Sequence, residues 1–325
     1  MTDQIKLFQK QIEELIQQQD LAKKPEELYQ PIAYTLNQGG KRLRPVLTLL
    51  ACELFGGKAE DVLYPALAVE VFHNFTLVHD DIMDKAPLRR GQETVYKKWN
   101  ADIAILSGDT MFALAYQLAL KTRPEFVSDI LHVFSKAAIE VCEGQQLDLN
   151  FETQENVSIE DYLDMIRLKT AVLLGTALEI GAIVGGANAS QMRSVYRFGI
   201  NLGIAFQLKD DLLDVYGNQE KFGKKSGGDI ATNKKTYLYL KALELSDEHQ
   251  YRTLKQLYNG QSSDENAKIK AVKSIFDSLN IKNQVENIMQ GYYENAVNDL
   301  HETGIDPEKL RNLLGFAQAL YRRNY

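Results

Sequence analysis

The chain of 325 residues is poor in the features that mark several large classes of protein. Its two cysteines, Cys52 and Cys142, are too few and too far apart for a disulfide framework or a thiolate metal site, so we expect a reducing compartment. The N-terminus lacks the apolar core of a signal peptide, and no uncharged apolar run approaches the ~20 residues that span a bilayer. We therefore expect a cytoplasmic protein without a transmembrane segment.

Positive charge is also in short supply. The chain has 37 Lys and Arg residues against 44 Asp and Glu, a net charge of −7. A nucleic-acid-binding surface needs a basic stripe, and this balance argues against one. An acidic chain is compatible with cationic partners, and divalent metal ions are one such class.

Proline is scarce, and its placement predicts the fold class. The chain has 7 prolines, and none lies between Pro124 and Pro307. Because proline inside a helix costs ~3 kcal/mol, so long a stretch without it favours a succession of helices. No linker rich in Pro, Gly or Ser divides the chain, so we expect an all-α fold in a single domain, residues 1–325.

Apolar periodicity supports the same fold class. The run from Ile200 to Leu213 begins with strand-like alternation, but it is too long for an ordinary strand and is interpreted as a buried helix. Amphipathic stretches of helix length lie between glycine-containing turns, at Ile5–Gln19, Pro45–Phe55, Ala101–Thr122 and Ile159–Val184.

Two short acidic clusters carry the clearest chemical signal. They are Asp80-Asp81-Ile82-Met83-Asp84 and, about 130 residues later, Asp210-Asp211-Leu212-Leu213-Asp214. In a helix, positions i and i+4 lie about 40° and ~6 Å apart, so the first and last aspartates of each cluster share one face. Like charges on adjacent turns destabilise a helix, and Mg²⁺, which takes a few carboxylates plus waters and substrate phosphates, would offset them. The alternative is two solvated helix faces, which a single cluster would not exclude.

Cationic side chains accompany both clusters. If a metal ion bridges the aspartates to a diphosphate, such side chains would complete the phosphate site. Candidates are Lys41 and Arg44 at a helix start, Arg89 and Arg90 five residues beyond the first cluster, Lys169 beside Thr170, and Lys224 and Lys234 after the second cluster. His73, two helical turns before Asp80, could face the same cavity or be a core residue. Arg42 and Lys98 are interpreted as ordinary surface charges.

Together these residues resemble the trans-isoprenyl diphosphate synthases. The ordered set, which is more specific than any one motif, covers residues 39–236: Gly40-Lys41-Arg42-Leu43-Arg44-Pro45, His73, Leu77 to Asp84, Arg89-Arg90-Gly91, Gly108-Asp109, Gly144-Gln145 with Asp148, Lys169-Thr170, Phe206-Gln207 with the second cluster, and Gly223-Lys224. Where the family often has Gly-Lys near the end of this region, the chain has Asn233-Lys234.

The resemblance implies a helical bundle around a deep central cavity, usually in a homodimer, and three magnesium ions. It implies metal ligation by Asp80, Asp84 and Asp210, and support of the metal-bound waters by Asp81, Asp211 and Asp214. Isopentenyl diphosphate would contact Lys41, Arg44, His73 and Arg90. The allylic diphosphate would contact Arg89, Lys169, Thr170, Gln207, Lys224 and Lys234.

Product length depends on the apolar face of the helix before Asp80. Phe75 lies five residues before that aspartate, ~7.5 Å along the axis, and Phe72 lies three residues further. The two rings could close the cavity or simply be core residues, and the small Thr76 leaves room. In the family, an aromatic residue at the position of Phe75 is typical of synthases of the geranylgeranyl type. A second aromatic residue at the position of Thr76 would favour the farnesyl type. We expect a twenty-carbon product, with farnesyl or longer polyprenyl products as the alternatives.

Three other functions fit the sequence less well. A terpene cyclase usually has a second motif with Ser or Thr and Glu, whereas this one is rich in aspartate. A di-iron bundle would need two Glu-x-x-His motifs, and only Glu70 to His73 fits. A non-catalytic regulatory subunit would be expected to lose one cluster or its cations, and this chain keeps both.

Overall fold

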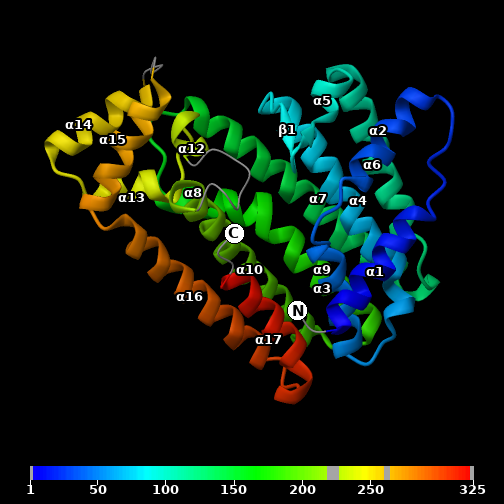
Figure 1. The fold of residues 1–325 in the computed structure, drawn as a ribbon. Helices are drawn as coiled ribbons and strands as arrows, with labels where there is room; N and C mark the ends of the chain where they lie inside the picture. Colours follow the sequence, from blue (N-terminus) through cyan, green and yellow to red (C-terminus); the bar gives the residue numbers. More distant parts are fainter. Residues whose placement is uncertain (1–2, 218–226, 260–263, 323–325) are drawn as a thin grey trace. The chain divides into compact units, whose positions relative to one another are not determined.

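The structure is a computed structural model that describes residues 3–217, 227–259 and 264–322 (Figure 1). Helices make up most of these residues: α1 (Asp3–Gln17), α2 (Glu26–Asn37), α3 (Leu43–Leu54), α4 (Ala59–Met83), α5 (Val95–Lys98), α6 (Ala101–Ala119), α7 (Pro124–Thr153), α8 (Ile159–Ile166), the π-helix η1 (Arg167–Ala171), α9 (Val172–Gly185), α10 (Ala189–Tyr216), α12 (Gly228–Ala231), α13 (Tyr237–Leu245), α14 (Glu248–Asn259), α15 (Glu265–Ser278), α16 (Ile281–His301) and α17 (Pro307–Tyr321). The strands in the described ranges, β1 (Leu88–Arg89) and β2 (Gln92–Glu93), form one antiparallel hairpin. The all-α prediction is confirmed.

Local sequence accounts for where several helices begin. The Asn100 side chain accepts a hydrogen bond from the Ile103 amide (2.9 Å) and so caps α6. Ser158 and Asp161 form a reciprocal capping box at the start of α8. The predicted buried helix at Ile200–Leu213 is confirmed within α10.

The predicted helix at Ile159–Val184 is not continuous in its hydrogen bonding. It consists of α8, the π-helix η1 and α9. A π turn keeps helical apolar periodicity on both sides, so the sequence pattern did not reveal it. The stretch Ile159–Gly185 is apolar and long enough to cross a membrane, but 78% of its most apolar window is buried inside the protein, as in a core helix.

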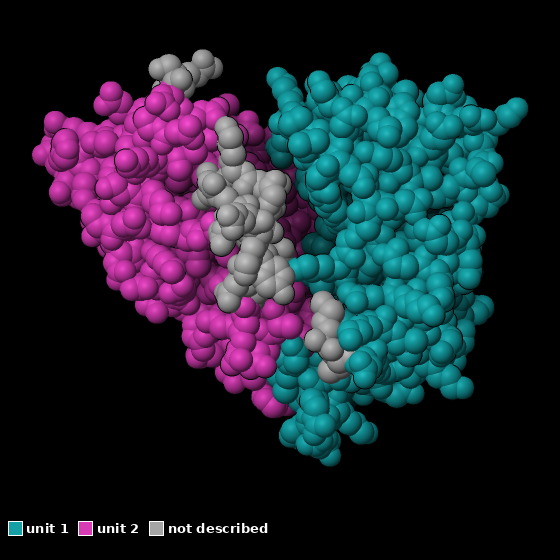
Figure 2. Space-filling view, in the orientation of Figure 1, with its two compact units in different colours: residues 1–137, 176–196, 303–315 teal, residues 138–175, 197–302, 316–325 magenta. Residues whose placement is uncertain are grey.

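The chain forms two compact units, which Figure 2 colours separately. Unit 1 comprises residues 1–137, 176–196 and 303–315, and unit 2 comprises residues 138–175, 197–302 and 316–325. The division falls within α7, α9, α10 and α17. The single-domain organisation of residues 1–325 stays a prediction.

Unit 1 is built around α4, which packs along α3 and α6. Most residues of α4 between Val62 and Val78 are buried, which suits a helix that is apolar on nearly all sides. Glycine allows a close approach of α3 and α9, since a Cβ added to Gly181 would lie 2.2 Å from the Thr48 carbonyl oxygen. The first acidic cluster is therefore carried by the central helix of its unit.

Unit 2 has its own core beneath the second acidic cluster. Buried side chains of α8, α10 and α13–α16 pack together, and the rings of Tyr239 and Tyr258 stack with centroids 3.8 Å apart. Leu208, Leu212 and Val215 of α10 belong to this core, whereas Asp210 and Asp214 are only partly buried. The core thereby fixes the rotation of α10 that presents the aspartates.

Candidate active site

The first acidic cluster stands at the C-terminal end of α4. Asp80 and Asp81 lie in the last turn, and the Asp84 amide, just beyond the helix, donates to the Asp80 carbonyl (2.8 Å). The helix dipole is negative at this end and disfavours each carboxylate by about 0.3–1 kcal/mol. Three aspartates therefore lie where the helix dipole disfavours negative charge, and a bound cation would offset that cost.

Asp81 differs from its neighbours because it is buried and paired within unit 1. Arg89 Nε donates to both of its carboxylate oxygens (2.8 and 2.9 Å), and Arg89 Nη2 lies 2.7 Å from Oδ1. Burial opposes the charged guanidinium, but Asp81, and then Asp80 and Asp84, outweigh it and raise the pKa of Arg89. Asp81 thus holds Arg89 beside the first cluster.

The second cluster occupies the last two turns of α10, again at a helix C-terminus. Its buried member, Asp211, accepts hydrogen bonds from the Tyr162 hydroxyl and from Gln207 Nε2 (2.9 Å). Gln207 Oε1 accepts in turn from the Thr170 hydroxyl (3.2 Å). Burial and the charge of Asp229 raise the pKa of Asp211 to about 8, while the two donors oppose the shift. The structure thereby joins Thr170, Gln207 and Asp211, all sequence-predicted, through one polar network.

Asp214 organises the chain that follows the second cluster. Its carboxylate accepts from the Asp229 amide (3.0 Å) and its carbonyl accepts from the Gly227 amide (2.7 Å). The Lys234 amide donates to the Asp229 carbonyl (2.9 Å), so two successive hydrogen bonds connect the Asp214 carboxylate to the Lys234 turn. Lys224 lies outside the described residues.

Arg44, His73 and Arg90 of unit 1 lie close enough together for the charge of one to shift the pKa of another. Burial lowers the pKa of Arg44 to about 10; Glu70 opposes this shift and Arg90 adds to it. Burial, and then the charges of Arg44 and Arg90, lower the pKa of His73 well below its usual range. Arg44 Nε is buried without a hydrogen-bond partner among the described residues. A buried donor without an acceptor is costly, so this group has the character of an anion site.

The β1–β2 hairpin sets the position of Arg90. Arg90 and Gly91 form its turn with φ of 52° and 76°, the positive values that tight hairpins require. Arg90 Nη1 donates to the Gly39 carbonyl, and a Cβ on Gly40 would lie 2.9 Å from the same nitrogen. The glycines before α3 therefore let Arg90 approach the helix start that carries Lys41 and Arg44.

Lys169 and Thr170 lie in the π turn η1, a kind of distortion frequent at functional sites. Lys169 Nζ lies 2.6 Å from Asp148 Oδ2 of α7. Two glycines face the turn: a Cβ on Gly144 would lie 2.3 Å from the Lys169 amide nitrogen, and one on Gly203 would lie 2.5 Å from Ala171 Cα. Backbone contact from α7 and α10 therefore holds the turn in place.

The residues predicted to limit product length lie in an aromatic cluster of unit 1. The rings of Phe72 and Phe75 are 5.4 Å apart between centroids, and each packs against Phe112 at 6.0 and 5.3 Å. Phe134 adds a further contact with Phe72 at 5.4 Å. The Thr76 hydroxyl donates to the His73 carbonyl (2.8 Å). Phe112 and Phe134, which the sequence did not single out, belong to the same aromatic cluster.

Two sequence interpretations are resolved by burial and pairing. Arg42 is not a surface charge: it is 2% exposed, and its guanidinium binds Glu13 (2.7 Å) and Glu70 (2.8 Å). The ion pair also accounts for Glu70, which therefore does not serve a di-iron motif with His73. Lys98 is exposed, as predicted, and its ammonium lies 4.2 Å from the ring centroid of Tyr34.

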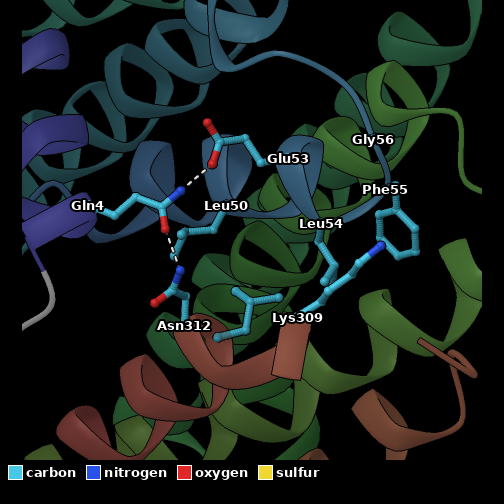
Figure 3. Close-up of a pocket in the computed structure, with 9 residues that line it drawn as sticks. Gln4, Leu50, Glu53, Leu54, Phe55, Gly56, Lys309 and Asn312 are labelled. Atoms are coloured by element: carbon cyan, nitrogen blue, oxygen red, sulfur yellow. Dashed lines mark hydrogen bonds between the residues drawn. The ribbon is translucent and has the colours of Figure 1, made fainter. Parts of the chain in front are cut away.

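A separate pocket of about 390 Å³ lies in unit 1 among residues of α1, α3 and α17 (Figure 3). Gln4 crosses it, donating to Glu53 and accepting from Asn312. The lining holds none of the predicted site residues; it consists of Gln4, Leu50, Glu53, Leu54, Phe55, Gly56, Lys309, Asn312 and Leu313. One carboxylate and one ammonium do not make a diphosphate site.

The donor set suits a hard metal ion that shares its ligands with a substrate. Within the described ranges, no three His, Cys, Asp or Glu side chains are grouped to hold a metal ion unaided. The half-buried and exposed members of both clusters offer only carboxylate oxygens, and Mg²⁺ combines one or two of these with waters and phosphate oxygens. The residues therefore fit magnesium in the presence of a diphosphate.

Comparison with known proteins decides the family. The model of the polyprenyl synthetase family matches residues 25–276. The chain belongs to this family. It is thus a prenyl-transferring enzyme, as the resemblance implied, and neither a di-iron protein nor a terpene cyclase.

Curated relatives and solved structures match most or all of the chain. A geranylgeranyl pyrophosphate synthase of Geoglobus acetivorans is 38% identical over 99% of this chain and 98% of its own. A geranylfarnesyl diphosphate synthase of Natronomonas pharaonis is 38% identical over 71% and 73%. A crystal structure of a geranylgeranyl pyrophosphate synthase has a TM-score of 0.95 at 43% identity and covers 100% of both chains.

Several supporting residues could not be found from the sequence. Tyr162 and Asp229 contact Asp211 and Asp214 of the second cluster from positions 49 and 15 residues away, and neither belongs to a motif. The π turn at Lys169 has no signature of its own in the apolar pattern. The glycines at 144 and 203 are a usable signal in retrospect, because a glycine inside a helix marks a close backbone approach.

Proposed function

We propose that this protein condenses isopentenyl diphosphate with an allylic diphosphate, head to tail, and releases geranylgeranyl diphosphate. One observation carries the proposal: two aspartate clusters stand at helix C-termini that disfavour negative charge, and both are accompanied by lysines or arginines. The printed names of the relatives support the twenty-carbon product, and the geranylfarnesyl relative marks the next longer product as the alternative.

We expect Asp80, Asp84 and Asp210 to ligate three magnesium ions around the allylic diphosphate. Asp81 and Asp211 are buried and bonded to protein donors, which suits a supporting role better than direct ligation. Asp214, bonded to the Asp229 amide, would support in the same way. When bound, the metal ions stabilise the negative charge of the departing diphosphate.

The cations of unit 1 would bind isopentenyl diphosphate. Arg44, with its unpaired Nε, and Arg90 offer guanidinium donors. The lowered pKa of His73 keeps its imidazole neutral, so this ring donates one N–H. Lys41 would add a fourth donor. The allylic diphosphate would be bound by Arg89, Lys169, Lys224 and Lys234.

The reaction follows from charge separation at the allylic carbon. The C1–O bond breaks, the diphosphate leaves with the electron pair, and an allylic carbocation forms. The Thr170 hydroxyl donates a hydrogen bond to Gln207 Oε1, so its own oxygen lone pairs are available to face that cation. The isopentenyl double bond attacks C1, and the new tertiary cation loses a proton from C2 to the departed diphosphate. Water must be excluded, because it would trap either cation.

We further propose a cytoplasmic homodimer. Both cysteines are free thiols, which suits a reducing compartment. On α6, Ile105 and Leu106 are 42% and 59% exposed, and Leu120, just beyond its C-terminal end, is 49% exposed. Exposed large apolar side chains along a helix and at its end are typical of a protein–protein interface, so α6 is the expected dimer contact.

The test is product analysis with purified protein, magnesium and isopentenyl diphosphate. Dimethylallyl, geranyl and farnesyl diphosphates are supplied separately, and the products are dephosphorylated and separated by chromatography. We expect geranylgeraniol from each starter. A twenty-five-carbon or longer alcohol would correct the product assignment, whereas no elongation from any starter would leave a non-catalytic subunit as the better interpretation.

A further inference from the structure

A buried lysine on α15 lies outside residues 39–236, which carry the sequence motifs of the site. Lys268 is 3% exposed, and burial lowers its pKa. No carboxylate of the described residues forms an ion pair with it. Its ammonium instead donates to the Ala231 carbonyl (3.3 Å) and to Asn233 Oδ1, and lies 5.3 Å from the Tyr258 ring centroid. A buried ammonium held by neutral acceptors is costly, so its position calls for an explanation.

The partners of Lys268 are both in the turn that leads to Lys234. Ala231 ends α12, whose last carbonyls are acceptors without helical partners. Asn233 has φ of 61°, in the left-handed region, at the position where the family often has glycine. Lys268 thus bonds the residue that makes the turn and the helix end that precedes it.

Helix α15 contacts the same segment at two further points. Ile269 packs against Gly227, where an added Cβ would lie 2.7 Å from its Cγ2. Asp277 accepts from the Tyr216 hydroxyl (3.0 Å) at the end of α10. One helix therefore supports the chain at the end of the second cluster, at the start of α12 and at the Lys234 turn.

We propose that Lys268 is a positioning residue for the allylic diphosphate site: through Asn233 it fixes the turn that presents Lys234. The inference rests on the proposed function for the identity of the ligand. Asn233 can replace the family's glycine because its side chain gains a buried cationic donor, which offsets the cost of the left-handed conformation. Lys268 itself does not touch the substrate.

The kinetic test compares Lys268→Met with wild type. Methionine keeps the apolar stem and removes the ammonium. We expect the KM for the allylic diphosphate to rise about tenfold, because a displaced Lys234 contact weakens binding of that substrate. The KM for isopentenyl diphosphate should change less than twofold. Lys270→Met is the matched control, since Lys270 is an exposed lysine of the same helix, and it should behave as wild type. Equal changes in both KM values, or none, would overturn the proposal.

A double-variant cycle tests whether Lys268 acts through Asn233. Asn233→Gly keeps the left-handed turn and removes the acceptor. If the two residues form one unit, Lys268→Met combined with Asn233→Gly should raise the allylic KM no more than the worse single variant. Multiplying effects would contradict the mechanism.

Hydrogen exchange separates this inference from the reaction itself. The amides of Asn233, Lys234 and Thr236 are hydrogen-bonded within the turn. In Lys268→Met their exchange should quicken about tenfold, with no change in Lys270→Met. Unchanged exchange would overturn the positioning role even in an active enzyme. If wild type fails to elongate any substrate, the proposed function fails, while the exchange result still decides whether Lys268 holds the turn.

Discussion

Asp211 is the most buried aspartate of the second cluster, at 4% exposure. A carboxylate in such a position needs donors, and Tyr162 and Gln207 supply them. The first cluster has a similar arrangement, in which Arg89 donates to the buried Asp81. In each cluster the middle aspartate is thus bonded to the protein, while its neighbours are more exposed.

Tyr162→Phe tests the importance of that hydroxyl. Loss of a hydrogen bond to a buried carboxylate should lower the free energy of unfolding by about 1–3 kcal/mol. Because Asp211 also orients Gln207, we expect kcat to fall about tenfold with the fold retained. Denaturant unfolding and initial rates check both. Tyr96→Phe is the control, since the Tyr96 hydroxyl has no hydrogen bond to another described residue; an equal loss in the control would refute a specific role.

The aromatic cluster at Phe75 makes a prediction about product length. Phe75→Leu shortens the side chain, so the product should gain at least one five-carbon unit. Thr76→Phe adds a ring one position nearer to Asp80, so its product should be shorter than that of wild type. Chromatography of the dephosphorylated products measures both changes. If neither variant alters the product, Phe72 and Phe75 are core residues without a role in chain length.

At the scale of elements, the π turn depends on glycines in two other helices. Because Gly144 has no Cβ, α7 can lie against the backbone of Lys169, and Gly203 does the same for α10 at Ala171. The turn is short and its own sequence does not specify it. Its geometry is therefore imposed by neighbours, which explains why helical periodicity predicted one uninterrupted helix there.

Gly144→Ala should disturb this arrangement. The added methyl would meet the Lys169 amide nitrogen at 2.3 Å, so one backbone must move. We expect a loss of stability of about 1–3 kcal/mol and a raised KM for the allylic diphosphate. Gly291→Ala is the matched control: it is also helical, but its Cβ would meet nothing within 4 Å, and stability should rise by about 0.5–1 kcal/mol. Thermal unfolding and steady-state kinetics measure both variants. Similar stability and KM in the two would argue against the packing account.

The helices could be predicted from sequence better than the contacts between them. Proline placement and apolar periodicity located α1, α3, α6 and α10, and the spacing of the aspartates placed each cluster on a helix. Arg42 was misjudged, because its burial depends on Glu13 and Glu70, which lie 29 and 28 residues away. The same limit hid Tyr162 and Lys268, since no local pattern records a partner that only the fold brings near.

At the scale of the whole molecule, α6 presents the apolar side chains proposed for the dimer. Leu106→Glu would place a charge in that interface, where it would be buried without a partner. We expect a monomer by analytical ultracentrifugation, with unchanged helical content by circular dichroism. Leu7→Glu is the control, because Leu7 is 53% exposed on α1, outside the proposed interface. A dimer that survives Leu106→Glu would exclude α6 as the contact.

The central claim is that the two aspartate clusters hold magnesium around a diphosphate. The most direct measurement is the elongation rate of metal-depleted protein titrated with Mg²⁺. The proteins compared are wild type, Asp80→Asn, Asp210→Asn and a control, Asp102→Asn, which changes an exposed aspartate of α6. We expect wild type and the control to be inactive without metal and fully active with it. Each cluster variant should be slower by about 10²–10³-fold at saturating substrate. Wild-type rates in both cluster variants, or elongation without any divalent ion, would contradict the account.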